Sequence, residues 1–372
     1  MITMTPRKWM PIFLAMLVIG PACSRREDFQ ATTTTERGIP VTKNPSRPRY
    51  KKASFKLAAE LVLNGKIENE DSFSTVDSFT IDRDGTIFVC DERAALIKTF
   101  DGRGRFLGSI ETVRPESGEL ENPQIVGTTA QGELAVENNG HGRLLYYSRD
   151  GRLLRSTSLA DINTFRLGVN SRGEILIHLY RYVRPNILYS LRLFDSSIKE
   201  LETLGQYWEP QSVGNDLYAY LPILWWVIDR GDRIVYGYPK TYELEIFGPD
   251  GTPARKIRKE QSPVPISEDE KAAYRKEYAK APYLRIRFPE VHSAFQKFTV
   301  DERGWIYVMT WERATDREGY WYDVFDDQGI YTARIALSRM PQLWAGGRLY
   351  MLDKEASGRV VLTRNTYEWN LR

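Results

Sequence analysis

The sequence is poor in cysteine and histidine. Among 372 residues, only Cys23 and Cys90 are cysteines, and the chain has three histidines. Two cysteines cannot form the disulfide framework that holds many small secreted domains together. Neither sign of charge is in large excess, because 52 basic and 49 acidic residues leave a net charge of +3. This balance gives no electrostatic signature for nucleic acid, and we expect no such partner.

Familiar catalytic motifs are missing as well. The sequence contains no Gly-x-Ser-x-Gly nucleophile elbow, no phosphate-binding loop and no zincin helix. It therefore shows no machinery for nucleophilic catalysis. Aromatic residues, in contrast, are abundant, with 21 Tyr, 15 Phe and 9 Trp. Large rings suit both strand-rich packing and exposed recognition surfaces.

The N-terminus reads as an export signal. Two basic residues, Arg7 and Lys8, precede an apolar run from Trp9 to Ile19 that is too short to cross a bilayer as a helix. We predict a signal peptide over residues 1–22 and an exported protein.

Cys23 follows this run directly and resembles the modified cysteine of bacterial lipoproteins. The resemblance implies a lipid anchor at Cys23, which would place the protein in the periplasm or at the outer membrane and in contact with a membrane only through that anchor. Gly20 stands where lipoprotein signals usually have Leu, so ordinary cleavage after Ala22 is the alternative.

Residues 23–50 are rich in Thr, Arg and Pro and include four consecutive threonines. This composition predicts a flexible tether. A short basic excess from Arg47 to Lys52 is explained as well by a tether as by a partner. Cys90 lies in an alternating apolar segment, and we expect it to be a buried small hydrophobic residue.

A repeat begins after residue 50. Its clearest copy contains IDRDGTIFVCDERAALIKTF, in which a strand, a glycine turn, a second strand, a loop and a third strand follow one another. The turn glycine recurs at Gly85, Gly132, Gly173, Gly231, Gly304 and Gly347. Glycine suits a two-residue hairpin loop because it adopts positive φ without a steric clash. Four strands in 40 to 50 residues are typical of a propeller blade.

Six copies predict an all-β, six-bladed β-propeller over residues 51–372. The sixth copy lacks an outer strand, whereas residues 56–65 form an unpaired strand before the first copy. We expect the N-terminal strand to complete the last blade, because closure removes exposed sheet edges. The prediction is a monomer.

The segment DRDGTIFVCDERAALIKTFDGRGRFLGSI resembles an NHL repeat, with its D-x-x-G turn, its strand ending in Asp and its "IxxFD" strand. DERGWIYVMT with YDVFDDQG is a weaker match, and the other four copies lose the strand-end Asp. The resemblance implies an NHL-like six-bladed propeller of a secreted bacterial protein. Such propellers host binding proteins, lyases and lactonases, so the resemblance does not decide activity.

Two long connections interrupt the repeat, over residues 206–222 and 258–292. Both join the last strand of one copy to the first strand of the next, so both fall on one face of a propeller. In the second, Ser267 and Glu270 form a capping box that opens a helix, and Pro282 stops it. The helical insertion is either a cap over the mouth of the channel or a surface excursion.

The loop-rich face carries the candidate binding residues, which are aromatic or arginine because these types dominate recognition energetics. They are Arg181, Trp208, Tyr218, Tyr220, Trp311 and Trp321. We expect a protein, peptide or glycan ligand and no cofactor, and the leading hypothesis is a cell-envelope binding or scaffold module.

The alternative is a metal-dependent propeller enzyme of the lyase or lactonase type. All three histidines, His141, His178 and His292, map to the same face and could converge on zinc, as in NHL-like amidating lyases. Glu137 and Asn138 supply part of a calcium site of the gluconolactonase type.

Overall fold

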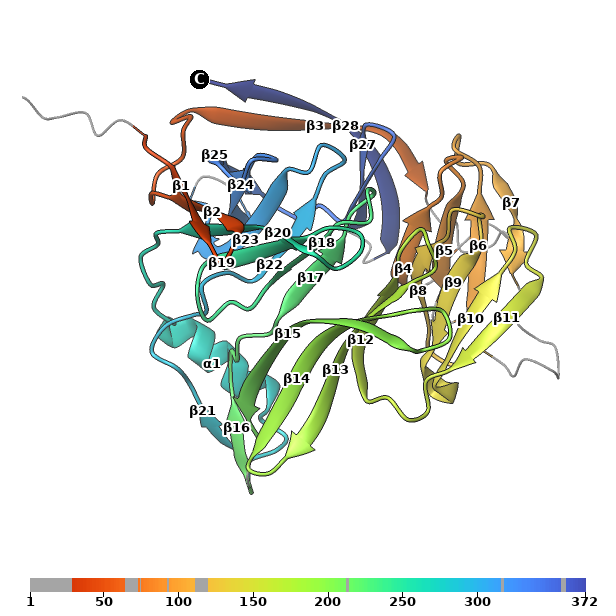
Figure 1. Ribbon diagram of the computed structural model, residues 1–372, viewed down its shortest axis with the longest axis horizontal. Helices are drawn as coiled ribbons and strands as arrows, with labels where there is room; N and C mark the ends of the chain where they lie inside the picture. Colours follow the sequence, from red (N-terminus) through yellow and green to blue (C-terminus); the bar gives the residue numbers. More distant parts are fainter. Residues whose placement is uncertain are drawn as a thin grey trace, which may run out of the picture.

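The computed structural model describes residues 29–63, 73, 75–91, 94–110, 120–211, 214–315, 318–355 and 359–372. Most of these residues lie in strands that form six antiparallel sheets around a common centre, with the first strand of each sheet nearest the middle (Figure 1). This arrangement confirms the six-bladed β-propeller that the repeats predict. The predicted signal peptide and Cys23 lie outside the described residues.

The first three blades follow one another along the chain, each with four strands running from the centre outward. Blade 1 contains β4 (Val76–Ile81), β5 (Ile87–Asp91), β6 (Leu96–Phe100) and β7 (Phe106–Ile110); blade 2 contains β8 (Pro123–Thr128), β9 (Leu134–Asn138), β10 (Arg143–Tyr147) and β11 (Leu153–Ser158), with the short helix η1 (Asn139–His141); blade 3 contains β12 (Thr164–Val169), β13 (Ile175–Val183), β14 (Asn186–Phe194) and β15 (Glu200–Pro210).

The last three blades repeat the pattern, with N-terminal strands added to two of them. Blade 4 contains β17 (Trp225–Ile228), β18 (Ile234–Gly237), β19 (Glu243–Phe247) and β20 (Pro253–Lys259), extended by β2 (Ile39–Asn44) and β1 (Thr32–Glu36); blade 5 contains β22 (Lys297–Val300), β23 (Ile306–Arg313), β24 (Tyr320–Phe325) and β25 (Tyr331–Leu337); blade 6 contains β26 (Leu343–Ala345), β27 (Arg348–Lys354), β28 (Val360–Leu371) and β3 (Ala53–Leu63).

The ring closes where the two ends of the chain meet. β3 pairs antiparallel with β28, from Ala53 opposite Leu371 to Leu63 opposite Leu362. The N-terminal strand thus supplies the outer strand of blade 6, as predicted. Backbone hydrogen bonds in both directions between Lys52 and Arg372 continue the ladder beyond β3.

The predicted tether over residues 23–50 is wrong for its C-terminal part. β2 pairs in parallel with β20 at the outer edge of blade 4. The backbone N–H groups of Arg49 and Tyr50 then donate to the carbonyls of Tyr331 and Thr332 at the outer edge of blade 5 (2.9 and 3.0 Å). We call residues 39–63 the belt, because they pass along blades 4, 5 and 6 in turn. The β-branched residues of β2 favour an extended backbone, and the outer edges of blades 4 and 5 offer it hydrogen-bonding groups.

Asn44 fastens the belt between two blades. Its side-chain amide donates to the carbonyls of Gly329 (2.8 Å) and Arg258 (3.2 Å), and its side-chain oxygen accepts from the N–H of Tyr331 (2.8 Å). The residue is only 3% exposed. Because Arg258 belongs to blade 4 and Tyr331 to blade 5, this one side chain ties the belt to both.

The recurrent turn depends on an acceptor three residues before the glycine. In blade 1, Asp82 accepts hydrogen bonds from the N–H groups of Asp84 and Thr86, and Gly85 has a φ of +84°. Backbone hydrogen bonds join Asp82 to Gly85 and to Thr86. The loop therefore has three residues rather than the predicted two, with the left-handed residue third.

Blade 4 shows that the conformation matters more than the glycine. There Asp229 accepts from the N–H groups of Gly231 and Arg233, but the residue with positive φ is Asp232 (+61°) and not Gly231. Asp tolerates the left-handed region better than most side chains. The repeated glycine identified the turn in this blade but missed its position by one residue.

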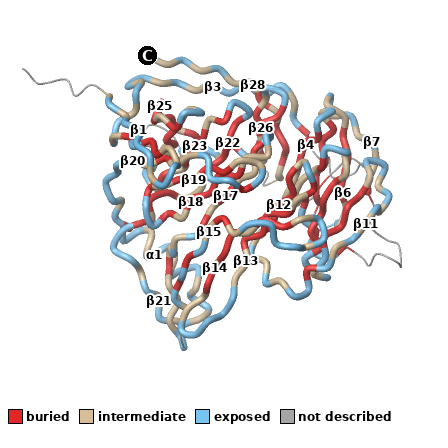
Figure 2. Tube along the Cα trace, in the orientation of Figure 1, coloured by how far each residue is buried: buried red, intermediate tan, exposed pale blue. Residues whose placement is uncertain are grey.

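Apolar side chains fill the spaces between neighbouring blades. Six clusters of buried residues lie at the six interblade interfaces, and Figure 2 shows burial concentrated along the strands rather than the loops. Cys90 is fully buried in one of them, where its thiol contacts the carbonyl of Pro123 at 3.2 Å. This placement confirms the predicted role of Cys90 as a buried small residue.

None of the helices in the described ranges is long and apolar enough to span a membrane. The longest is α1 (Glu268–Glu277), which begins at the predicted capping box. Ser267 accepts from the N–H of Glu270, and the carboxylate of Glu270 accepts from the N–H of Ser267. The helix ends before Pro282, at Glu277.

Removing the side-chain amide of Asn44 should loosen the belt. Asn44→Ala leaves the buried N–H of Tyr331 and two carbonyls without their partner, which should lower the free energy of unfolding by about 2 to 3 kcal/mol. Urea denaturation measures the change. Asn139→Ala is the control, because Asn139 is exposed and its side chain donates one described hydrogen bond, to the carbonyl of Asn122 at 3.3 Å. Equal denaturation midpoints for the two variants would contradict the role of Asn44.

Candidate functional site

A central channel runs between the inner strands of all six blades. It has a volume of about 770 Å³ and is lined by residues such as Thr80, Gln124, Arg166, Trp226 and Glu302. Polar side chains point into it from several blades. The channel is thus a solvated space of the size that ligand sites usually have.

Two cations lie close to one another at one end of the channel. The guanidinium carbon of Arg166 lies 4.3 Å from the ring centroids of both Trp225 and Trp226, and its Nη1 donates to the carbonyl of Trp226 (3.1 Å). Burial lowers the pKa of Arg166 to about 10. Burial and the nearby charge of Arg166 also lower the pKa of Lys297. Arg166 lines the channel and Lys297 lies near it outside the lining, and the positive charges of both make this end of the channel electropositive.

Two acidic side chains at the other end of the channel accept hydrogen bonds from turns of neighbouring blades. Glu302 accepts from the N–H groups of Gly346 (2.9 Å) and Gly347 (2.7 Å). Asp232 accepts from the N–H (2.8 Å) and hydroxyl (2.5 Å) of Ser171. These carboxylates serve contacts between neighbouring blades, so they are structural groups first.

Blade 3 carries a projection on the loop-rich face. β12 pairs with β13 only as far as Leu179, whereas β13, β14 and β15 continue beyond it. We call residues 181–189 and 207–210 the wing. The predicted loop over residues 206–222 therefore begins as strand, because β15 extends to Pro210.

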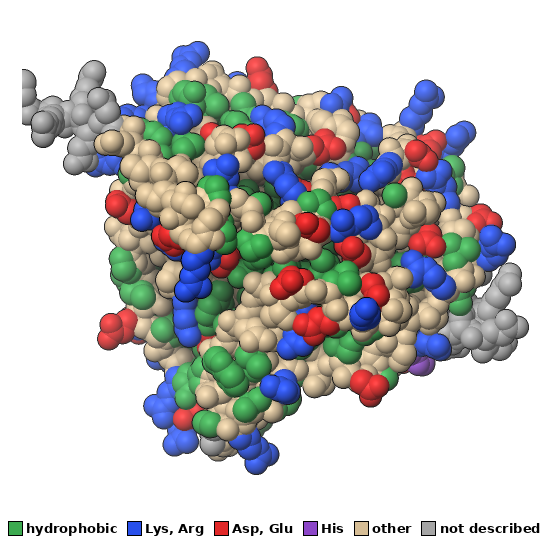
Figure 3. Space-filling view, viewed as in Figure 1, with side chains coloured by type: hydrophobic (Ala, Val, Ile, Leu, Met, Phe, Trp, Pro, Cys, Tyr) green, Lys and Arg blue, Asp and Glu red, His purple; other side chains and the backbone are tan. Residues whose placement is uncertain are grey.

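One face of the wing joins two predicted binding residues. Arg181 is opposite Leu188, and Leu188 is opposite Trp208, so the three side chains form a row across the strands. Arg181 is exposed and Trp208 is 50% exposed, while Leu188 is buried between them. Tyr182, on the other face, is 58% exposed. Hydrophobic side chains gather at this end of the molecule, over the ends of β14 and β15 (Figure 3).

The other face of the wing is a ladder of rings that leads into the interblade core. Tyr189 stacks on Tyr207 at 5.0 Å, and Tyr207 stacks on Tyr238 of blade 4 at 4.1 Å. His178 joins the ladder through a hydrogen bond between its Nε2 and the hydroxyl of Tyr207 (3.0 Å). Burial, with a smaller effect of Arg166, lowers the pKa of His178 to about 4. The ring of His178 is therefore neutral at physiological pH.

The two predicted insertions pair with one another. Within them, β16 (Asp216–Tyr218) and β21 (Arg285–Arg287) form a parallel two-stranded sheet, and Tyr218 lies opposite Arg287. The insertion over residues 258–292 contributes no side chain to the channel lining, and α1 lies at the outer side of blades 3 and 4 (Figure 1). The side chains of the helix therefore do not line the channel.

Aromatic rings hold this insertion against blade 5. His292 stacks on Trp311 with centroids 4.1 Å apart and planes at 8°, and Tyr220 meets His292 edge-on at 5.1 Å. His292 Nε2 lies 3.2 Å from the carboxylate of Glu270, and the hydroxyl of Tyr220 donates to the Glu270 carbonyl (3.4 Å). Burial lowers the pKa of His292, although Glu270 opposes the shift.

The three histidines predicted as zinc ligands have three different sets of partners. His178 is bonded to Tyr207, His292 is paired with Glu270, and His141 lies 3.8 Å from Glu121. Within the described ranges, no three side chains of His, Cys, Asp or Glu are placed to hold a metal ion. The donor set needed for catalytic zinc is therefore not assembled by these residues.

The proposed calcium ligands have other surroundings too. Asn138 is buried, and its side-chain oxygen accepts from the N–H of Glu121 (2.9 Å), which fixes the connection between blades 1 and 2. Glu137 is 5% exposed, and burial raises its pKa to about 7. Asp91, at the matching strand end of blade 1, accepts from the N–H groups of Thr75 and Ala94, both at 3.4 Å.

The six predicted binding residues fall into three places. Arg181 and Trp208 lie on the wing, Tyr218, Tyr220 and Trp311 belong to the insertion and its contacts, and Trp321 lies on β24 beside Arg334. They do not form one continuous rim. The sequence pattern located the loop-rich face but not the grouping of its residues.

Sequence reasoning missed Arg166, Lys297, Tyr189 and Tyr207 because these residues lie inside strands. One signal could have revealed the two cations. Polar residues recur near the starts of inner strands, at Gln124, Arg166, Lys297 and Gln342, where a buried strand would be expected to start with apolar residues.

Glu137 makes stability depend on pH. Its pKa is raised from 4.5 to about 7 in the folded protein, so the unfolded chain releases the proton first as pH rises. Stability should therefore fall between about pH 4.5 and 7, by about 3 kcal/mol in total. Glu137→Gln should match the wild type near pH 4 and exceed it by that amount at pH 8, as chemical denaturation would measure. The exposed Glu368→Gln is the control; a constant difference across the pH range would contradict the assignment.

Comparisons of sequence give no family. No model of a known protein family matches the chain, and no curated protein sequence matches it. The NHL resemblance accordingly stays a likeness of short motifs.

Solved structures share the fold at low sequence identity. An exported protein of Bacteroides fragilis is 11% identical with a TM-score of 0.54, over 89% of this chain and 99% of that one. Virginiamycin B lyase of Staphylococcus aureus is 9% identical with a TM-score of 0.44, over 84% and 99%. A gluconolactonase of Xanthomonas campestris is 12% identical with a TM-score of 0.42, over 84% and 90%. At these identities the chain is similar to these proteins in fold alone.

Proposed function

We propose that the protein is an exported, envelope-tethered binding module that engages a protein, peptide or glycan through the wing of blade 3. The signal-like residues 1–22 and Cys23 support export and a lipid anchor. A fold shared with an exported protein is consistent with the same location.

The observation that carries the proposal is the exposed row across the wing. On the face of this row Trp208 is 50% exposed and Val183 is 36% exposed, and Tyr182 on the opposite face is 58% exposed. Rings of this kind, together with an arginine, are the residues that supply most of the binding energy at interfaces. Their gathering on one projection, beside an arginine, supports a surface that a partner covers.

The wing also offers backbone groups. The N–H of Tyr180 still donates to the carbonyl of Asn163 (3.0 Å), and beyond it β13 has no neighbouring strand on the side of β12 among the described residues. A free strand edge can accept an extended peptide through main-chain hydrogen bonds, and side chains at alternate positions then give specificity. Among protein, peptide and glycan ligands, this strand edge favours a protein or peptide.

Stacking in the tyrosine ladder makes the wing rigid. Tyr189, Tyr207 and Tyr238 fix its inner face to blade 4, and Lys240 lies 3.6 Å from Glu209 on the outermost strand. A rigid platform loses little conformational entropy when it binds. The surroundings of Trp208 are thus pre-organised for a partner.

Photo-crosslinking in cells tests the proposal. A photoreactive amino acid replacing Trp208 should form a covalent adduct with one partner, and the same replacement at Leu107 should not. Leu107 is the matched control because it is 52% exposed but lies on β7 in blade 1, away from the wing. Adducts should also decrease when Arg181→Glu is added. Equal adducts from both positions, or none from Trp208, would rule out the wing as the binding surface.

A further inference from the structure

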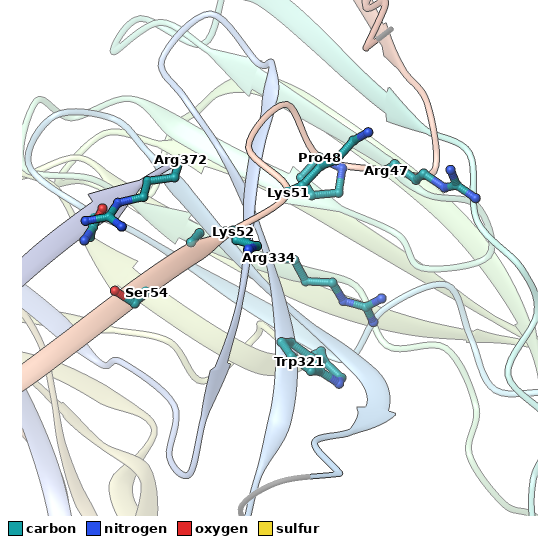
Figure 4. Close-up of a pocket in the computed structure, with 10 residues that line it drawn as sticks. Arg47, Pro48, Lys51, Lys52, Ser54, Trp321, Arg334 and Arg372 are labelled. Carbon is teal, nitrogen blue, oxygen red and sulfur yellow. The ribbon is translucent and has the colours of Figure 1, made fainter. Parts of the chain in front are cut away.

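A second hollow lies far from the wing, where the belt passes blades 5 and 6. It has a volume of about 760 Å³ and is lined by Arg47, Pro48, Lys51, Lys52, Ala53, Ser54, Trp321, Arg334, Asn370 and Arg372. We call it the basic groove. Five of these residues are cationic, and none has a carboxylate side chain. Figure 4 shows Lys52, Arg334 and Trp321 in the middle of the groove, with Arg47 and Arg372 toward opposite ends.

Most of these cations have no acidic partner. Among the described residues, no ion pair involves Arg47, Lys51, Lys52 or Arg372, all of which are exposed. Elsewhere, cations such as Arg149, Arg233 and Arg303 are paired with carboxylates, whereas these four gather around one hollow. A set of unpaired cations around a hollow attracts an anion.

Arg334 and Trp321 are held in place by a buried network. Asp323 is 1% exposed and accepts hydrogen bonds from the hydroxyls of Tyr331 (2.6 Å) and Tyr242 (2.8 Å). Arg334 Nη2 pairs with Glu312 (2.8 Å), its Nε lies 3.7 Å from the carboxylate of Asp323, and its guanidinium carbon lies 5.3 Å from the ring centroid of Trp321. These contacts fix the floor of the groove before any ligand arrives.

We propose that the basic groove binds a glycan that carries carboxylate groups. Guanidinium groups match a carboxylate with two parallel hydrogen bonds, and lysines add charge without fixed geometry. The indole of Trp321 gives a large apolar face on which a sugar ring can pack. Ser54 and Asn370 supply hydrogen-bonding groups for hydroxyls.

The shape of the groove favours a chain molecule over a membrane surface. Trp321 is half-buried inside the hollow, where a flat layer of headgroups cannot reach it. None of the ten lining residues is an exposed large hydrophobic residue that could insert into lipid. The belt brings Arg47, Lys51 and Lys52 to this position, so the site exists only in the closed ring. It does not involve the wing and is independent of the function proposed above.

Binding of oligogalacturonate tests the proposal, with an uncharged galactan oligomer as the comparison. The wild type should bind oligogalacturonate with an affinity that falls as salt concentration rises, and it should not bind the galactan. Lys51→Glu combined with Lys52→Glu should weaken binding at least about tenfold, because two attractive charges become repulsive. Trp321→Ala should weaken binding as well while the protein stays folded, as its circular dichroism spectrum would report.

The matched control is a second double variant that changes the net charge by the same amount outside the basic groove. Lys43→Glu combined with Lys56→Glu alters two exposed lysines of the belt that do not line the groove, and it should bind as the wild type does. Equal losses in the two double variants would mean that net charge alone drives binding, and would overturn the proposal. It would also be overturned if oligogalacturonate failed to bind while phosphatidylglycerol vesicles bound the wild type and not the groove variant.

Discussion

The structure depends on the pairing of β3 with β28, which joins the start of the folded chain to its end. Each interblade core needs a blade on both sides, and blade 6 lacks its outer strand until β3 arrives. The six clusters of buried residues therefore form one closed circle rather than a row with two exposed ends. Closure also covers the edge of β28, which would otherwise be open to pairing with another chain.

The belt extends this closure from one blade to three. On its way to β3 the chain pairs with the outer edges of blades 4 and 5, and Asn44 bonds to both of them. The same path carries the basic stretch from Arg47 to Lys52 to the side of Arg334 and Trp321. The belt has the composition of a linker in its first part, yet it joins three blades and lines one side of the basic groove.

Local patterns predicted much of the fold. The turn motif was visible because an Asp or Asn acceptor and a residue with positive φ must stand at fixed spacing, as at Asp82 and Gly85. The capping box at Ser267 and Glu270 was visible for the same reason, since both partners lie within one helical turn. Even the missing strand of blade 6 could be inferred, because a sheet with a free edge requires a partner.

Long-range pairing explains what the sequence did not reveal. Nothing in the composition of residues 32–44 distinguishes a tether from an edge strand, because the choice depends on the free edge of β20 more than 200 residues away. The pairing of β16 with β21 and the separation of the three histidines likewise depend on the paths of connections between blades. The candidate sites were harder to foresee than the fold, since Arg166 lies in a strand rather than in the loops where binding residues were sought.

Hydrogen–deuterium exchange of two shortened chains would test the central role of the belt most directly. A chain that begins at residue 29 keeps the whole belt, and a chain that begins at residue 65 lacks it. The account predicts that the first protects the amides of β25 and β28 as the full chain does. The second should lose protection in both strands and unfold at lower urea concentration. Unchanged protection of β28 in the chain without the belt would contradict the account.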